Sequence, residues 1–153
     1  MGGSAANALH LANDLHYGVG MNRQGENQAG LRVEALTSNI GVFSCLANDV
    51  GYEEVFAHQL FVKSDKDDLV IVLSGSGNSE NVVRALEYGQ DNNLNTFAIL
   101  GYDGGKCLQI SKNSVHFEVC DMQIAEDAQL LVGHLCMKWL NKRMRSRVYG
   151  ECL

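Results

Sequence analysis

The sequence contains no proline, so its turns must rely on glycine, asparagine, aspartate and serine. It has no excess of basic residues: the formal net charge is −6, which argues against nucleic acid as the main partner because phosphate backbones select basic surfaces. We find no apolar run long enough to span a bilayer, and we expect no signal peptide. The composition therefore predicts a protein whose partners include neither nucleic acid nor a membrane.

The five cysteines are widely scattered, and none forms a CxxC pair. This usage predicts reduced thiols in the cytoplasm, most of them packed as small apolar side chains. The chain has 153 residues, of which 46% are hydrophobic and 20% charged, so it is long enough for one domain with its own core. We expect a single domain over residues 1–153.

Apolar runs of strand length alternate with segments of helical periodicity. The pattern predicts strands at 32–36, 69–73, 96–100 and 115–119, and helices at 4–17, 40–47, 53–62, 80–90, 106–110 and 124–147. A polar, glycine-rich loop is expected at 18–30. Because strands and helices alternate, we expect a parallel α/β sheet in three layers, flanked by helices.

The run Ser74–Ser79 carries the clearest chemical signal. It follows the strand Leu69–Leu73, which has no polar alternation and is expected to be buried on both faces, and it precedes the helix that starts at Glu80. A Gly/Ser turn between a strand and a helix directs backbone N–H groups at a helix N-terminus, where a phosphate binds well. The alternative is a tight turn in which Ser79 caps the helix. No lysine follows as in a P-loop, so the donors are hydroxyls and amides.

Five segments in order resemble the motifs of SIS (sugar isomerase) domains and, more closely, of the phosphoheptose isomerase family. They are Gly2–His10, Asn48–Phe56, Ser74–Ala85, Gly101–Lys106 and Glu126–His134. The resemblance covers about residues 2–140 and leaves a basic tail at 141–153. Five motifs at family-like spacing form a far stronger signal than one glycine-rich loop.

The resemblance implies a Rossmann-like sheet of five strands and a homotetramer with active sites between subunits. It implies an enzyme that converts sedoheptulose 7-phosphate into D-glycero-D-manno-heptose 7-phosphate for surface polysaccharide synthesis. A family member carries a further helical segment and a first strand in front of Gly2, and we expect this chain to lack both.

The resemblance also assigns the substrate contacts. Ser74, Ser76 and Ser79 match the residues that bind the substrate phosphate. Ser4 matches a serine that contacts the sugar, and Asn48 and Asp49 match a pair that lines the same cleft. Without the resemblance, Asn48 and Asp49 are equally read as a turn that stops a helix. Gly75 stands where the family usually has threonine, which removes one hydroxyl.

Aldose–ketose isomerisation needs a base, an acid and stabilisation of a developing oxyanion. The resemblance assigns a zinc site to positions matched here by His10, Asp14, Glu126 and His134. We expect His134, Asp14 and Glu126 to be catalytic. Asp14 replaces a glutamate and Glu126 a glutamine, and Glu126 lies eight positions before His134, about 12 Å along a helix. The alternative is that these histidines simply pack against apolar neighbours.

Two rival functions stay open. The substitutions at 14, 75 and 126 favour a non-catalytic SIS protein that binds a phosphosugar or a replication initiator. An isomerase of a different phosphosugar is also compatible with the motifs. The basic residues Lys142, Arg143, Arg145 and Arg147 are expected to complement a helix C-terminal dipole, with an RNA or membrane patch as the alternative.

Overall fold

The computed structural model describes residues 2–20 and 29–149. Its centre is a sheet in the order β1-β2-β3, made of β1 (Leu69–Ser74), β2 (Asn95–Leu100) and β3 (Asn113–His116). Both pairs are parallel, with Val72 opposite Ala98 and Ile99 opposite Val115. A helix connects each strand to the next, so the carboxyl ends of all three strands lie at one edge.

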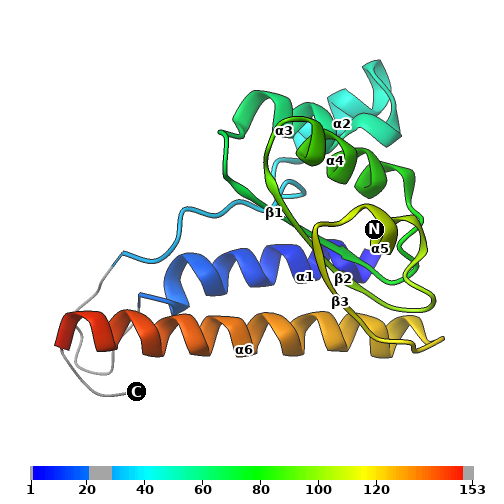
Figure 1. The fold of residues 1–153 in the computed structure, drawn as a ribbon. Helices are drawn as coiled ribbons and strands as arrows, with labels where there is room; N and C mark the ends of the chain where they lie inside the picture. The colour runs from blue at the N-terminus through cyan, green and yellow to red at the C-terminus, as the bar shows by residue number, and fades with distance from the viewer. Residues whose placement is uncertain (1, 21–28, 150–153) are drawn as a thin grey trace.

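Helices cover both faces of the sheet (Figure 1). One face carries α2 (Ile40–Asp49), the short helix η2 (Tyr52–Glu54), α3 (Ala57–Lys63) and α4 (Glu80–Asp91). The other face carries α1 (Gly2–Asn13) and α6 (Met122–Tyr149), which lie side by side. The helix α5 (Gly105–Ile110) joins β2 to β3. The parallel α/β fold expected from the sequence is confirmed.

The core lies between the sheet and α4. Val83 and Leu86 of α4 are at most 2% exposed and pack with Ala98 and Leu100 of β2. These α4 residues belong to the apolar stripe that the helical periodicity predicts. The core therefore fixes α4, and with it the loop that precedes the helix.

The strand β1 is buried on one face only, which corrects the expectation of a strand buried on both faces. Val70 and Val72 are buried, whereas Leu69 and Ile71 are 60% and 44% exposed. The exposed residues alternate with the buried ones along the strand, so they lie on its opposite face, where α1 leaves them partly accessible.

Three further expectations are corrected. Residues 32–36 form no strand, because no strand of the sheet pairs with them. The helix expected at 53–62 divides into η2 and α3, and β3 begins at Asn113 and ends at His116. Part of the loop expected at 18–30, part of the tail, and the side chains of Arg145 and Arg147 lie outside the described residues.

The helix α1 changes its hydrogen bonding before it ends. Asp14–Gly18 form a π-helical turn, η1, that continues α1 without a break. Such turns are rare and occur often at functional sites. Asp14, the first residue of η1, is one of the predicted site residues. Among the helices that the structure describes, none combines the length and the apolar character that a bilayer span requires.

Candidate functional site

The serine loop, residues 74–79, is folded by bonds among its own residues. The Ser74 hydroxyl accepts a hydrogen bond from the Gly77 N–H at 3.0 Å, and the Ser76 hydroxyl accepts one from the Asn78 N–H at 3.3 Å. The Asn78 amide donates to the Ser76 carbonyl at 3.1 Å. These turns curl the chain at the carboxyl end of β1, the edge where open α/β sheets bind ligands.

The loop that follows β2 and the start of α5 contact the serine loop and hold its backbone through hydrogen bonds. Gly77 has φ +65°, and a Cβ built on it would lie 2.0 Å from the Gly104 carbonyl oxygen. The Gly77 carbonyl accepts the Cys107 N–H at 3.0 Å, and the Asn78 side chain accepts the Lys106 N–H at 3.0 Å. Only glycine fits at position 77, so the serine loop is preformed before any ligand arrives.

Ser79 occupies the N-cap position of α4, but its side chain makes no capping hydrogen bond. The alternative in which the Ser79 hydroxyl caps the helix is therefore not what the structure contains. The hydroxyl is left for another partner, beside the backbone N–H groups that a helix start leaves unpaired.

A second group of polar side chains lies between α1 and α6. His10 Nε2 and His134 Nε2 are 2.9 Å apart, and Asp14 Oδ2 lies 3.5 Å from the first and 3.4 Å from the second. We call these three residues the His-Asp-His cluster. Zinc bonds of about 2.0–2.1 Å in tetrahedral geometry place ligand atoms roughly 3.3 Å apart. The three donor atoms lie 2.9–3.5 Å apart, close to that spacing, so the cluster is compatible with a zinc ion.

A buried polar contact fixes how α1 lies against α6. The Asn7 amide donates to the Glu126 carbonyl at 2.9 Å and to Gln129 Oε1 at 3.1 Å, while the Gln129 amide donates to the Ser4 hydroxyl at 3.2 Å. Asn7 and Gln129 are 8% and 1% exposed. Sequence reasoning gave neither residue a role, although both lie about one turn before a cluster histidine.

The structure does not bring Glu126 to the cluster. Its carboxylate covers Gly3, where a Cβ would lie 2.0 Å from Glu126 Oε2, near the start of α1. The eight positions between Glu126 and His134 span about 12 Å of straight helix, which separates their side chains. The three-residue cluster therefore contains His10, Asp14 and His134 but not Glu126.

Asn48 and Asp49 lie neither in the serine loop nor in the His-Asp-His cluster. They end α2, on the face of the sheet that α4 covers, whereas the cluster lies on the face of α1 and α6 (Figure 1). Both residues are exposed, and the Asn48 amide donates to Asp49 Oδ1 at 2.6 Å. Within one copy of the chain, the predicted site residues are thus divided among four places: the serine loop, the cluster, the start of α1 with Ser4 and Glu126, and the end of α2.

Two thiols have raised pKa values. A hydrogen bond to Asp49, the charge of that carboxylate and burial all raise the pKa of Cys45. Burial raises the pKa of Cys107, beneath the serine loop, to about 11. Both thiols therefore stay protonated at neutral pH, which makes them poor nucleophiles and poor metal ligands.

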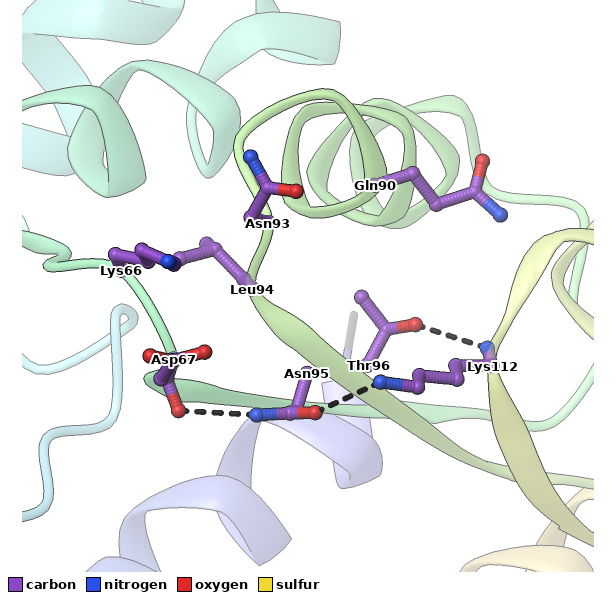
Figure 2. A pocket seen from close by; sticks show the side chains of 8 residues that line it. All are labelled: Lys66, Asp67, Gln90, Asn93, Leu94, Asn95, Thr96 and Lys112. Atoms are coloured by element: carbon purple, nitrogen blue, oxygen red, sulfur yellow. Dashed lines mark hydrogen bonds between the residues drawn. The ribbon is translucent and has the colours of Figure 1, made fainter.

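A pocket of about 550 Å³ lies at the amino ends of β1 and β2, the edge opposite the serine loop. Figure 2 shows the side chains that line it. Its polar side chains largely satisfy one another: Asn95 accepts the Lys112 ammonium at 3.0 Å and donates to the Asp67 carbonyl at 3.0 Å. None of the predicted site residues lines this cavity. The candidate site is therefore at the carboxyl edge and the α1–α6 contact.

Comparison with known proteins gives consistent matches. The model of the SIS domain family matches residues 1–101. The phosphoheptose isomerase of Helicobacter pylori strain P12 is 34% identical over 134 residues, which are 88% of this chain and 67% of that protein. The phosphoheptose isomerase of Aquifex aeolicus is 31% identical over 146 residues, which cover 95% of this chain and 74% of that protein.

Solved structures of phosphoheptose isomerases also resemble this chain. The phosphoheptose isomerase from Neisseria gonorrhoeae superposes with a TM-score of 0.80 at 26% identity, over 93% of this chain and 73% of that one. The enzyme from Francisella tularensis gives a TM-score of 0.76 at 22% identity, over 94% of this chain and 72% of that one. The second likeness concerns the fold alone.

Proposed function

The chain belongs to the SIS domain family, and we propose that it is a phosphosugar isomerase converting sedoheptulose 7-phosphate into D-glycero-D-manno-heptose 7-phosphate. The structural observation that carries the proposal is the meeting of His10, Asp14 and His134 within 2.9–3.5 Å on two helices far apart in the sequence. The similarity of the chain to phosphoheptose isomerases over most of its length supports this class of reaction.

The reaction moves a proton from C1 to C2 and another from the C1 hydroxyl to the C2 oxygen, through an enediol. His134 and Asp14 are the acid and base of this exchange, because they lie 3.4 Å apart and can pass one proton between them. His10, at 2.9 Å from His134, orients its ring. A zinc ion on Nε2 of His10, Nε2 of His134 and Oδ2 of Asp14 would instead polarise the sugar carbonyl as a Lewis acid, and the His134 nitrogen that held the metal would then not carry the proton. Asp14 would keep its second carboxylate oxygen for the proton.

The serine loop holds the phosphate in this proposal. The Ser76 and Ser79 hydroxyls and the free N–H groups at the start of α4 donate to the phosphate oxygens. The Ser74 hydroxyl, which accepts from Gly77, still has its own proton to donate. Ser4 and Glu126, both at the start of the α1–α6 contact, act on the sugar, and Glu126 is proposed as the second catalytic carboxylate.

We propose further that the chain forms a homotetramer whose active sites lie between subunits. Leu131, Leu135 and Trp139 follow one another at four-residue steps on α6 and are 58–59% exposed. A stripe of this size is unusual on a monomer and suits burial by a second copy. Assembly would also allow Asn48 and Asp49 of one copy to approach the cluster of another. A cytoplasmic location is proposed on the cysteine usage.

The alternative is a non-catalytic SIS protein that binds phosphosugars or a replication initiator. The substitutions at 14, 75 and 126 support it, and the Glu126 carboxylate lies away from the cluster. Such a protein would keep the serine loop and the assembly without turnover.

Turnover and metal content decide between the two. The purified chain is incubated with sedoheptulose 7-phosphate, the aldose product is followed by NMR, and zinc is measured by mass spectrometry. We expect product and about one zinc ion per chain, in a tetramer by light scattering. A folded tetramer that stays inactive with zinc supplied, yet binds the sugar phosphate, would establish the non-catalytic alternative.

A further inference from the structure

The serine loop has no cation of its own. Its side-chain donors are hydroxyls and the Asn78 amide, and all are neutral. A phosphate monoester carries close to two negative charges at pH 7. Neutral donors bind it through partial charges alone, so a nearby ammonium group would add strongly to the affinity.

Lys106 is held against the loop through its backbone. Its N–H donates to Asn78 Oδ1 at 3.0 Å, and the next N–H, of Cys107, donates to the Gly77 carbonyl at 3.0 Å. Lys106 lies in the first turn of α5, which starts at Gly105. Its long stem therefore begins one hydrogen bond away from the serine loop, whatever conformation the side chain adopts.

Among the residues that the structure describes, the ammonium group of Lys106 is held by one exposed ion pair. Its Nζ lies 3.3 Å from Glu80 Oε2, and the side chains are 61% and 44% exposed. Ion pairs in such positions are weak and readily exchanged. A lysine stem has four rotatable carbons, so the group can move without a change in the backbone.

Glu80 has a second partner that would stay with it. Arg84 Nε lies 3.5 Å from Glu80 Oε1, and Arg84 also lies within 3.5 Å of Glu87 and 3.8 Å of Glu54. Arg84 is thus tied to three carboxylates, whereas Lys106 is tied to one. If Lys106 leaves, Glu80 is not left without a cation.

We propose that Lys106 exchanges Glu80 for the phosphate of the substrate and supplies the positive charge that the serine loop lacks. Lys106 is then a binding residue selective for phosphorylated ligands. The inference rests on the proposed function only for the identity of the sugar, because the exchange concerns the phosphate group.

Binding of inorganic phosphate, measured by calorimetry, tests the exchange directly. Lys106→Met is expected to weaken phosphate binding about tenfold at low salt, with a smaller difference at high salt where charges are screened. Lys106→Arg keeps the charge and is expected to retain most of the affinity. Glu80→Gln removes the competing carboxylate and is expected to tighten phosphate binding two- to threefold, on the order of a weak surface pair.

The matched control is Lys112→Met, at the opposite edge of the sheet, which is expected to bind phosphate like the original protein. In turnover, Lys106→Met should raise KM for sedoheptulose 7-phosphate and leave kcat unchanged. Unphosphorylated sedoheptulose should bind the variant and the original protein equally.

Three results would overturn the role of Lys106: unchanged phosphate affinity in Lys106→Met, an equal loss toward unphosphorylated sedoheptulose, or no phosphate binding by the original protein. The failure of the proposed function is a different result. In that case the original protein binds phosphate and Lys106→Met weakens it, but no variant converts the sugar.

Discussion

The serine loop and the His-Asp-His cluster are built in different ways. The loop is held by short-range turns and by the adjoining β2–α5 loop, and Gly75 and Gly77 are buried. The cluster joins side chains 124 positions apart in the sequence, and its two histidines are 49% and 39% exposed. The loop is therefore a rigid receptor in one copy of the chain, whereas the cluster depends on how two helices align. Substrate binding and chemistry should respond separately to substitution.

Removing His134 should have the largest effect. His134→Ala deletes the proposed acid/base group and a zinc donor, so turnover should fall about a thousandfold, within the range that general acid–base groups supply. Phosphate binding should be unchanged, because the serine loop lies at the start of α4. Steady-state kinetics and phosphate calorimetry on the same preparation give both readouts. His58→Ala, at an exposed position of α3, is the control; turnover that survives in His134→Ala would remove the catalytic assignment.

The second substitution damages the loop and spares the cluster. In Gly77→Ala the new methyl group meets the Gly104 carbonyl at 2.0 Å, on a backbone with φ +65°. We expect a loss of about 2–4 kcal/mol in the free energy of unfolding and loss of phosphate binding. Denaturant titration measures the first and calorimetry the second. Gly2→Ala, where a Cβ meets nothing within 4 Å, is the control. Zinc content that falls together with phosphate binding would show that the two regions are not separate.

The difference between the serine loop and the His-Asp-His cluster also explains which features could be predicted from the sequence. The serine loop, the strand before it and the helix after it form one continuous segment, so local patterns sufficed to predict these elements, although not that β1 is buried on one face only. The resemblance assigns His10 and Asp14 to one site, and because they lie four positions apart on one helix the structure brings them together. Contacts between residues far apart in the sequence could not be predicted from such local patterns. The segment 32–36 has strand-like residues but no neighbouring strand to pair with, and propensity alone does not make a strand.

Glu126 shows the same limit within a helix. The resemblance placed it beside His134 in one metal site, but their spacing on a straight helix puts the two side chains over different turns of α1. The register of α1 on α6 is set by the buried amides of Asn7 and Gln129, whose partners lie on the opposite helix. No pattern in a single sequence identifies such a contact. The structure therefore groups three of the four residues that the resemblance assigns to one metal site, and the fourth, Glu126, lies apart from them.

Substitutions of Asp14 test whether the charge or the length of its side chain matters for zinc binding. Asp14→Asn keeps the shape and removes the charge, and we expect zinc affinity to fall roughly tenfold to a hundredfold, the range seen when a metal's supporting groups are lost. Asp14→Glu keeps the charge with one more methylene and should retain most of the affinity. Competition with a chromogenic chelator measures both. Equal zinc affinity in Asp14→Asn and the original protein would mean that Asp14 is not a ligand.

The smallest effects separate two serines within the loop. The Ser79 hydroxyl makes no capping bond, so Ser79→Ala should leave the free energy of unfolding unchanged and raise KM about two- to tenfold, the worth of one hydrogen bond to the phosphate. Ser74 is 6% exposed, and its oxygen accepts the Gly77 N–H, so Ser74→Ala leaves a buried donor without a partner. That variant should lose about 1–3 kcal/mol of stability before any effect on binding is considered. If Ser79→Ala destabilised the protein as much as Ser74→Ala, its hydroxyl would be structural, and the ligand-facing side of the loop would rest on Ser76 and the backbone N–H groups alone.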